Sequence, residues 1–259
     1  MFAVSSLVLA TGFAFQAGAP ARQASTVPPA APQAASAGNF APPALTPEMR
    51  GDIMMARKMY RDALDYYKPG AEKSAVLANK TGIAYHQLQD LVNARKYYEK
   101  AIKLSPRYAE AINNLGTIFY ARKSYRRAVE QYKKALRLTP DSASILSNLG
   151  TAYFARKNYM EASNAYQQAL AIDPEVFERR SSQGTLLQDQ SVEERAKFHY
   201  YLAKTYAHAG VKDRTILYVR KALEEGFKER DKFTKEPEFA FLQDDPEFKE
   251  LLATEQRVL

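Results

Sequence analysis

Side chains able to catalyse a reaction or to hold a metal are few and scattered in this sequence. The 259 residues include three histidines, His86, His199 and His208, and no cysteine. No two histidines form a His-x-x-x-His or HExxH pair, and the sequence contains no GxSxG, P-loop or GxGxxG pattern. The acidic pair Asp244–Asp245 precedes Pro246 and is read as a turn and helix cap. We therefore expect no enzymatic activity, no metal site, no cofactor and no disulfide.

Amide side chains are better candidates for the chemistry of recognition. Asn114 and Asn148 stand at the same place in the similar stretches "NNLGTIFYARKSYRRA" and "SNLGTAYFARKNYMEA". Because an amide both donates and accepts hydrogen bonds, a short row of asparagines can bind the backbone of an extended peptide. The sequence leaves a second interpretation open, in which these amides tie adjacent helices together.

The two stretches belong to a longer repeat, whose regular spacing is typical of a solenoid. The segments 75–106, 109–140 and 143–174 fit one frame, and the phrase Ala-Arg-Lys also occurs earlier, at 56–58. The recurring residues are Gly82, Gly116 and Gly150; Tyr85, Phe119 and Tyr153; Ala94, Ala128 and Ala162; Tyr98, Tyr132 and Tyr166; Ala101, Ala135 and Ala169; and Pro106, Pro140 and Pro174.

Each repeat reads as two helices joined by a short turn. Leu115, Ile118 and Phe119 fall at i, i+3 and i+4 on one face of a first helix, and residues 128–136 give a second helix a matching apolar face. We expect Gly116 to lie where the two helices cross closely, because a larger side chain there would overpack the contact at a cost of about 1–3 kcal/mol. One hairpin cannot bury its apolar face alone, so neighbouring repeats must stack.

These offsets, Gly-x-x-Tyr/Phe, Ala-x-x-x-Tyr, Ala-Leu/Ile and Pro, resemble the tetratricopeptide repeat (TPR) family, in its bacterial exported type with a C-terminal helical end segment. The resemblance implies an all-α fold, a right-handed α-solenoid of stacked helix-turn-helix repeats. Repeats 1 to 4 would span residues 46–174, the first being shorter and divergent. A divergent repeat 5 would span 193–227, and 228–259 would form a C-terminal helical cap.

The segments outside the repeats differ in composition. Residues 1–21 carry no charge and read as a signal peptide, with an uncleaved N-terminal anchor or a disordered apolar tail as the alternatives. The Ala/Pro-rich residues 22–45 predict a disordered linker. Residues 175–192 form an insertion that breaks the repeat, read either as a short helix through Arg180 or as a small hairpin. Arg179 and Arg180 are a candidate secondary contact, or else part of a packed spacer.

In the TPR family the first helix of each pair lines a concave groove, and the resemblance implies the same role for the matching positions here. Among them, Tyr120, Phe154, Tyr200 and Tyr201 are expected to be aromatic anchors. The peptide-binding groove would be lined by Asn79, Lys80, Ile83 and His86; Asn113, Asn114, Thr117 and Tyr120; Ser147, Asn148, Thr151 and Phe154; and Tyr200, Tyr201, Lys204 and His208.

One feature limits the ligand expected in this groove, and one pair of substitutions tests the expectation. The lysine–asparagine clamp that some family members use for acidic C-terminal tails is not reproduced, because Ile83 and Thr117 stand where an amide is wanted. Replacing Asn114 and Asn148 with alanine is expected to weaken partner binding and to leave thermal unfolding nearly unchanged.

The net charge of +8 is concentrated away from the expected groove. Lys133, Lys134 and Arg137 lie on the outer side of a second helix, mainly as a solubilising surface, with binding of an anionic surface or nucleic acid as the alternative. Nucleic acid is disfavoured because basic and aromatic residues do not interleave along the groove. Arg122 and Lys123 are read mainly as turn residues that oppose a helix dipole, and a binding role for such Arg-Lys pairs is the alternative.

We therefore expect a non-enzymatic protein–protein interaction scaffold that binds a protein or peptide segment, and no small-molecule substrate, in a cell-envelope assembly. The expected location is exported, periplasmic or membrane-tethered facing outward, with possible membrane association through the N-terminus and a cytoplasmic location as the alternative. A regulatory or accessory subunit of an enzyme complex is a further candidate. The partner and the oligomeric state are not predicted.

Overall fold

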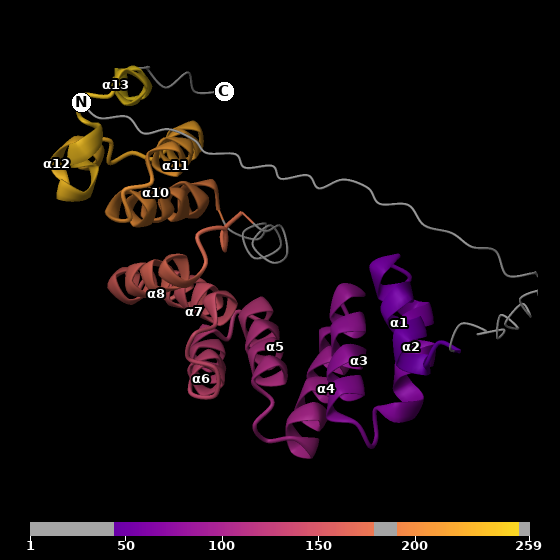
Figure 1. Ribbon diagram of the computed structural model, residues 1–259. Helices are drawn as coiled ribbons and strands as arrows, with labels where there is room; N and C mark the ends of the chain where they lie inside the picture. The colour runs from indigo at the N-terminus through magenta and orange to yellow at the C-terminus, as the bar shows by residue number, and fades with distance from the viewer. Residues whose placement is uncertain (1–43, 179–190, 254–259) are drawn as a thin grey trace, which may run out of the picture. The chain divides into compact units, whose positions relative to one another are not determined.

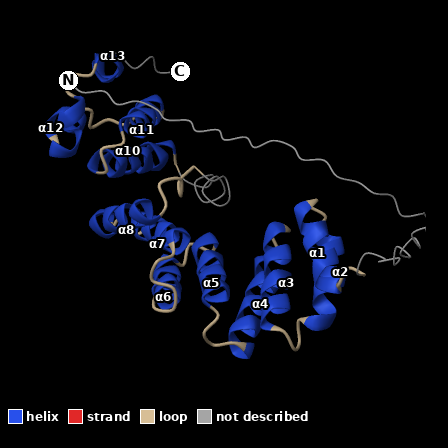
Figure 2. Cartoon of the chain, in the orientation of Figure 1, coloured by secondary structure: helices blue, strands red, loops and turns tan. Residues whose placement is uncertain are grey.

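The computed structural model describes residues 44–178 and 191–253, and all regular structure in these ranges is helical (Figure 2). Figure 1 shows the helices following one another in chain order. Their bounds are α1 Pro47–Ala56, α2 Tyr60–Tyr67, η1 Lys68–Gly70, α3 Ala75–Gln87, α4 Leu91–Leu104, α5 Ala109–Ala121, α6 Tyr125–Leu136, α7 Ala143–Ala155, α8 Tyr159–Ile172, α10 Val192–His208, α11 Lys212–Glu224, α12 Lys232–Lys235, η2 Pro237–Leu242 and α13 Pro246–Ala253.

Consecutive helices pack as hairpins, α1 with α2, α3 with α4, α5 with α6, α7 with α8 and α10 with α11. Each second helix of the first three hairpins also packs on the first helix of the next one, and α10 packs on α8. The larger cluster of buried apolar side chains extends from Ala94 to Phe248, and a smaller one joins Ala71, Ala78, Ala101 and Ala111. The all-α solenoid fold predicted from the sequence repeat is therefore confirmed.

A glycine against a tyrosine ring sets the contact inside each of the first four hairpins. A Cβ added at Gly116 would lie 2.6 Å from the ring of Tyr132, and one added at Gly150 would lie 2.4 Å from Tyr166. The same relation joins Gly51 to Tyr67 and Gly82 to Tyr98. Since the tyrosine rings are almost completely buried, they cannot move aside cheaply, and the glycines are required for close packing.

The Arg-Lys phrase forms the turn inside the hairpin. The backbone N–H of Ser124 donates to Phe119 O and that of Lys123 donates to Tyr120 O, both at 2.8 Å, which is a Schellman end to α5. Lys123 has a positive φ of 57°, as do Lys58 at 60° and Lys157 at 63°, and Gly210 takes this place in the fifth hairpin. Lysine is therefore held in a conformation that favours glycine.

The start of the predicted insertion is a packed turn. Residues 174–178 form turns, and Phe177 is buried against the rings of Tyr166 and Tyr206. Glu178 pairs with Arg214 at 3.2 Å and accepts a hydrogen bond from Tyr206 at 3.4 Å. These contacts fit the packed-spacer interpretation for residues 174–178. Arg179 and Arg180 lie outside the described residues, as do the predicted N-terminal segment 1–21 and residues 22–43 of the predicted linker 22–45.

The C-terminal segment covers the end of the array with aromatic side chains. Tyr200 of α10 stacks on Phe227, with ring centroids 4.5 Å apart, and also meets Phe233 and Phe239. Asp245 caps α13 by accepting from Phe248 N at 3.1 Å, and Pro246 is the first residue of that helix. This arrangement gives the last hairpin an apolar neighbour, as a solenoid end requires.

Candidate functional site

The first helices α1, α3, α5 and α7 carry a row of side chains, polar at every position but one, at fixed places relative to the recurring glycine. These are the residues three and two positions before Gly51, Gly82, Gly116 and Gly150. We call this row the ladder face, and its members are Glu48 and Met49, Asn79 and Lys80, Asn113 and Asn114, and Ser147 and Asn148.

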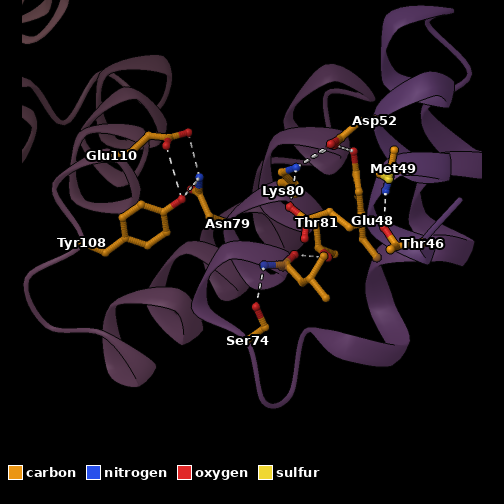
Figure 3. Close-up of polar contacts among 12 residues, drawn as sticks. Thr46, Glu48, Met49, Asp52, Ser74, Asn79, Lys80, Thr81, Tyr108 and Glu110 are labelled. Carbon is orange, nitrogen blue, oxygen red and sulfur yellow. Dashed lines mark hydrogen bonds and ion pairs between the residues drawn. The ribbon is translucent and has the colours of Figure 1, made fainter. Parts of the chain in front are cut away.

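Side chains of the ladder face join each first helix to the next. Asn114 Nδ2 donates to Asn79 Oδ1 at 3.0 Å, and Asn148 Nδ2 donates to Asn113 Oδ1 at 3.0 Å. We call each of these contacts between successive first helices a rung. The rung between α3 and α1 is ionic, with Lys80 Nζ 2.7 Å from Glu48 Oε1 (Figure 3). In every rung, the residue two positions before the recurring glycine of one repeat binds the residue three positions before the recurring glycine of the preceding repeat. The interpretation that the amides tie adjacent helices together is thus supported.

The amide rungs are linked into one directed chain of hydrogen bonds. Asn113 Nδ2 donates to Asn114 Oδ1 at 3.4 Å within α5, and Asn79 Nδ2 donates to Glu110 Oε1 at 2.9 Å (Figure 3). An ionised carboxylate only accepts, so Glu110 fixes the direction of every donor before it. Hydrogen bonds in such a chain polarise and strengthen one another.

The N-terminal end of the ladder face is closed by an ionic cluster. Lys80 Nζ lies 2.7 Å from Asp52 Oδ1 as well as from Glu48, and Tyr67 OH donates to Asp52 at 2.6 Å. Burial opposes the charge on Lys80, but the hydrogen bonds and the two carboxylates raise its pKa. Burial likewise raises the pKa of Asp52 while the bonds from Lys80 and Tyr67 lower it, and the net change is downward. Lys80 is therefore committed to internal pairs.

The other end of the ladder face is open, at Asn148. Its Nδ2 donates to Asn113, while its Oδ1 has no hydrogen-bond partner within residues 44–178 and 191–253. Asn148 is half-buried, whereas the neighbouring Ser147 and Thr151 are buried. Thr151 Oγ1 donates to Ser147 O at 2.9 Å and accepts from Tyr166 OH at 3.4 Å. Asn148 Oδ1 is thus an unused polar atom on a half-buried side chain at this end of the ladder face.

The expected aromatic anchors are mostly core residues, which corrects the prediction of an exposed aromatic lining. Tyr120, Phe154 and Tyr200 are 6%, 4% and 2% exposed. Tyr201 is half-buried and stacks on Tyr159, with ring centroids 5.0 Å apart. Tyr120 contacts Tyr125 at the start of α6, and Phe154 contacts Phe198 of α10. The positions of these rings on the first helices did not predict that they would be covered.

Of the remaining predicted lining residues, some bond to other residues of this chain, and the others range from partly buried to exposed. Lys204 pairs with Glu236 at 3.1 Å and Glu238 at 3.3 Å, so the C-terminal segment occupies its charge. Thr117 Oγ1 accepts from Tyr132 OH and donates to Asn113 O, both at 3.3 Å. His86 is half-buried and burial lowers its pKa, Ile83 packs against the core, and His208 is exposed.

Sequence reasoning missed the two carboxylates that terminate the polar row, Glu48 and Glu110. The signal for Glu48 was available, because it stands three residues before Gly51, as Asn79 stands before Gly82. Glu110 lies at the start of α5, and nothing in the repeat pattern marks it. Only the packing of α5 on α3 brings it to Asn79.

Comparison with known proteins identifies the repeats. The family profile described as "TPR repeat" matches residues 82–121 and 116–155, and that described as "Tetratricopeptide repeat" matches 143–176. Residues 82–176 of the chain are tetratricopeptide repeats. Repeats of this kind are typically non-catalytic interaction modules, and they support a protein-interaction scaffold.

Solved structures similar to this chain include those titled "Crystal structure of MamA" and "MamA 41-end from Desulfovibrio magneticus RS-1". Each is 21% identical and matches 68% of this chain, with 93% and 90% of the other chain covered and TM-scores of 0.47 and 0.48. A third, "YrrB: a TPR protein with an unusual peptide-binding site", is 16% identical over 71% of this chain and 86% of that one, with a TM-score of 0.46. No curated protein matches the sequence.

Two further observations concern the described residues alone. Their His, Asp and Glu side chains form no group of three or more suited to hold a metal ion. None of the helices in 44–178 and 191–253 combines the length and the apolar character needed to cross a membrane.

Proposed function

We propose that this scaffold, acting without catalysis, binds an extended peptide segment of a partner protein on the ladder face, with Asn148 as the central contact. The observation that carries the proposal is the unused Oδ1 of Asn148 at the open end of the amide chain. A backbone N–H of the peptide would donate to this oxygen, and the second N–H of the Asn148 amide would donate to a peptide carbonyl.

The hydrogen-bond chain supports this role because it holds Asn148 in one orientation. Asn113 Oδ1 fixes Nδ2 of Asn148 at 3.0 Å, and the donors beyond it run to Glu110. A polar group held in place before binding loses less conformational entropy when a ligand arrives. Asn113, Asn114 and Asn79 each use both their amide nitrogen and their amide oxygen internally, so they support Asn148 rather than duplicate it.

A pair of variants tests the proposal. A library of random peptides is selected on the immobilised full chain, and the dissociation constants of enriched peptides are compared between Asn148→Ala and Asn113→Ala. Both variants lose the same rung, but only Asn148→Ala removes the proposed contact. We expect Asn148→Ala to weaken binding by about tenfold or more, the worth of a hydrogen bond left unpaired, and Asn113→Ala to weaken it much less. Equal losses would reject Asn148 as a contact.

We further propose that the partner belongs to the cell envelope and that this protein is exported or held at the membrane facing outward. The support is compositional, because residues 1–21 carry no charge and residues 22–45 are rich in Ala and Pro. Cell fractionation with protease digestion of intact and permeabilised cells tests it. Protection of the protein until the inner membrane is opened would contradict the proposal.

A further inference from the structure

The turns inside the first four hairpins lie along one edge of the array. The rungs of the ladder face join equivalent positions of α1, α3, α5 and α7 with the same offset each time. These helices therefore run in the same direction, and their C-terminal ends lie at the same side. We call the connections that follow them, residues 57–61, 88–92, 122–126 and 156–160, the turn edge.

The turn edge is strongly basic and the opposite edge is not. Its four segments contain eight Lys or Arg residues and one acidic residue, Asp90. The connections at the opposite edge, 68–74, 105–108, 137–142 and 173–178, contain four basic and five acidic residues. Counted over the described residues, Arg57, Lys58, Lys123 and Lys157 of the turn edge are exposed and make no ion pair.

Apolar side chains project among these cations. Met160 is 76% exposed and Val92 is 73% exposed, which makes them the most exposed large apolar residues of the described ranges. They occupy equivalent positions two repeats apart, with Arg126 at the same place in the repeat between them. Met59 adds a third apolar side chain at this edge, 43% exposed.

We propose that the turn edge binds the surface of an anionic lipid bilayer, a role separate from the peptide contact at the ladder face. Lys and Arg residues are attracted to acidic headgroups, and exposed apolar side chains enter the boundary between headgroups and acyl chains. A polyanion in solution would use the cations alone and has no use for Val92 and Met160. The positive φ of Lys58, Lys123 and Lys157 holds these residues in fixed, protruding turns.

The absence of cysteine from the sequence allows a site-specific test. Full-length protein carrying Met160→Cys is labelled with an environment-sensitive dye and mixed with vesicles containing about 30 mol% phosphatidylserine in phosphatidylcholine. Protein carrying Ile172→Cys is the matched control, since Ile172 is 44% exposed at the other end of α8. We expect the emission of the label at position 160 to shift to the blue and that at 172 to stay unchanged.

Charge variants complete the test. Lys123→Glu with Lys157→Glu should weaken partition into these vesicles by about tenfold or more, since each cation near the surface contributes roughly fivefold. Lys103→Glu with Arg137→Glu makes the same change in net charge near the opposite edge and should have little effect. Glutamate retains a Cβ at the left-handed positions, so the backbone strain is unchanged, and circular dichroism confirms folding.

Three results would overturn the proposal. The first is an unchanged emission of the label at position 160 when anionic vesicles are added. This result counts against the proposal even if the protein attaches to the vesicles through its N-terminal residues. The second is an equal loss for both charge pairs. The third is salt-sensitive binding of a soluble nucleic acid without any vesicle-induced shift of the label.

Discussion

The amide of Asn114 donates a hydrogen bond to the amide of Asn79, 3.0 Å away and 35 positions earlier in the chain. The bond joins α5 to α3, and its counterpart joins α7 to α5 through Asn148 and Asn113. Each of these two repeats thus contributes one hydrogen bond between successive first helices. The polar row therefore has a structural role as well as a proposed role in recognition.

The first prediction concerns the energy of a rung. Asn79→Ala and Asn114→Ala should each lower the free energy of unfolding by about 1 kcal/mol, and the double variant should lose less than the sum, with a coupling of about 0.5–1.5 kcal/mol. Urea unfolding of the four proteins measures this cycle. Strictly additive losses would show that the two amides do not interact. This expectation replaces the one from sequence, that removing such amides leaves unfolding unchanged.

The second prediction concerns the glycine at the helix crossing. Gly116→Ala should destabilise the protein by about 1–3 kcal/mol, because the new Cβ would meet the buried ring of Tyr132 at 2.6 Å. The fifth hairpin has Ala203 and Val219 at the equivalent places, both buried. In a Tyr132→Val background, Gly116→Ala should therefore cost much less. Equal costs in the two backgrounds, measured by thermal unfolding, would refute this explanation of the glycine.

The third prediction concerns the left-handed lysine of the hairpin turn. Lys123→Gly should leave stability unchanged or raise it by up to about 1 kcal/mol, because glycine adopts φ near 57° without steric cost. Lys123→Val should lower stability, since a β-branched side chain is strained there. Chemical denaturation of both variants tests the pair. Loss of stability on Lys123→Gly would mean that the lysine side chain itself holds the turn.

The fourth prediction concerns acid sensitivity. Burial lowers the pKa of His199, partly offset by Glu225 2.8 Å from its Nδ1, while Lys221 and Arg195 lower it further. Burial also lowers the pKa of His86. A lowered folded-state pKa means that the unfolded chain binds the proton first, so stability should fall as pH drops below about 6.5.

Replacing His199 and His86 with glutamine should flatten this dependence between about pH 7 and 5. His208→Gln is the control, because His208 is exposed. Denaturant midpoints at several pH values provide the measurement. An unchanged pH slope in the His199→Gln, His86→Gln variant would assign the acid sensitivity to the carboxylates instead.

The sequence was sufficient to predict the repeat and its helices. Gly116, Tyr132 and their equivalents recur at a fixed spacing, because the same glycine–tyrosine contact is made inside each of the first four hairpins. It was less informative about exposure. Tyr120 and Phe154 lie on first helices, as predicted, yet neighbouring side chains cover them. Lys204 was expected to face a ligand, but Glu236 and Glu238 of the C-terminal segment neutralise it. Such contacts join distant parts of the chain, and the repeat pattern does not encode them.

The proposed function requires that Asn148 binds peptide backbone while Asn113 only positions it. A nuclear magnetic resonance titration of 15N-labelled protein with a selected peptide follows the side-chain amide signals and so reports on this contact itself. We predict that the Asn148 side-chain signal shifts as the peptide saturates, while that of the exposed Asn164 on α8 does not move. A peptide that saturates the protein without any shift of the Asn148 signal would rule out this contact.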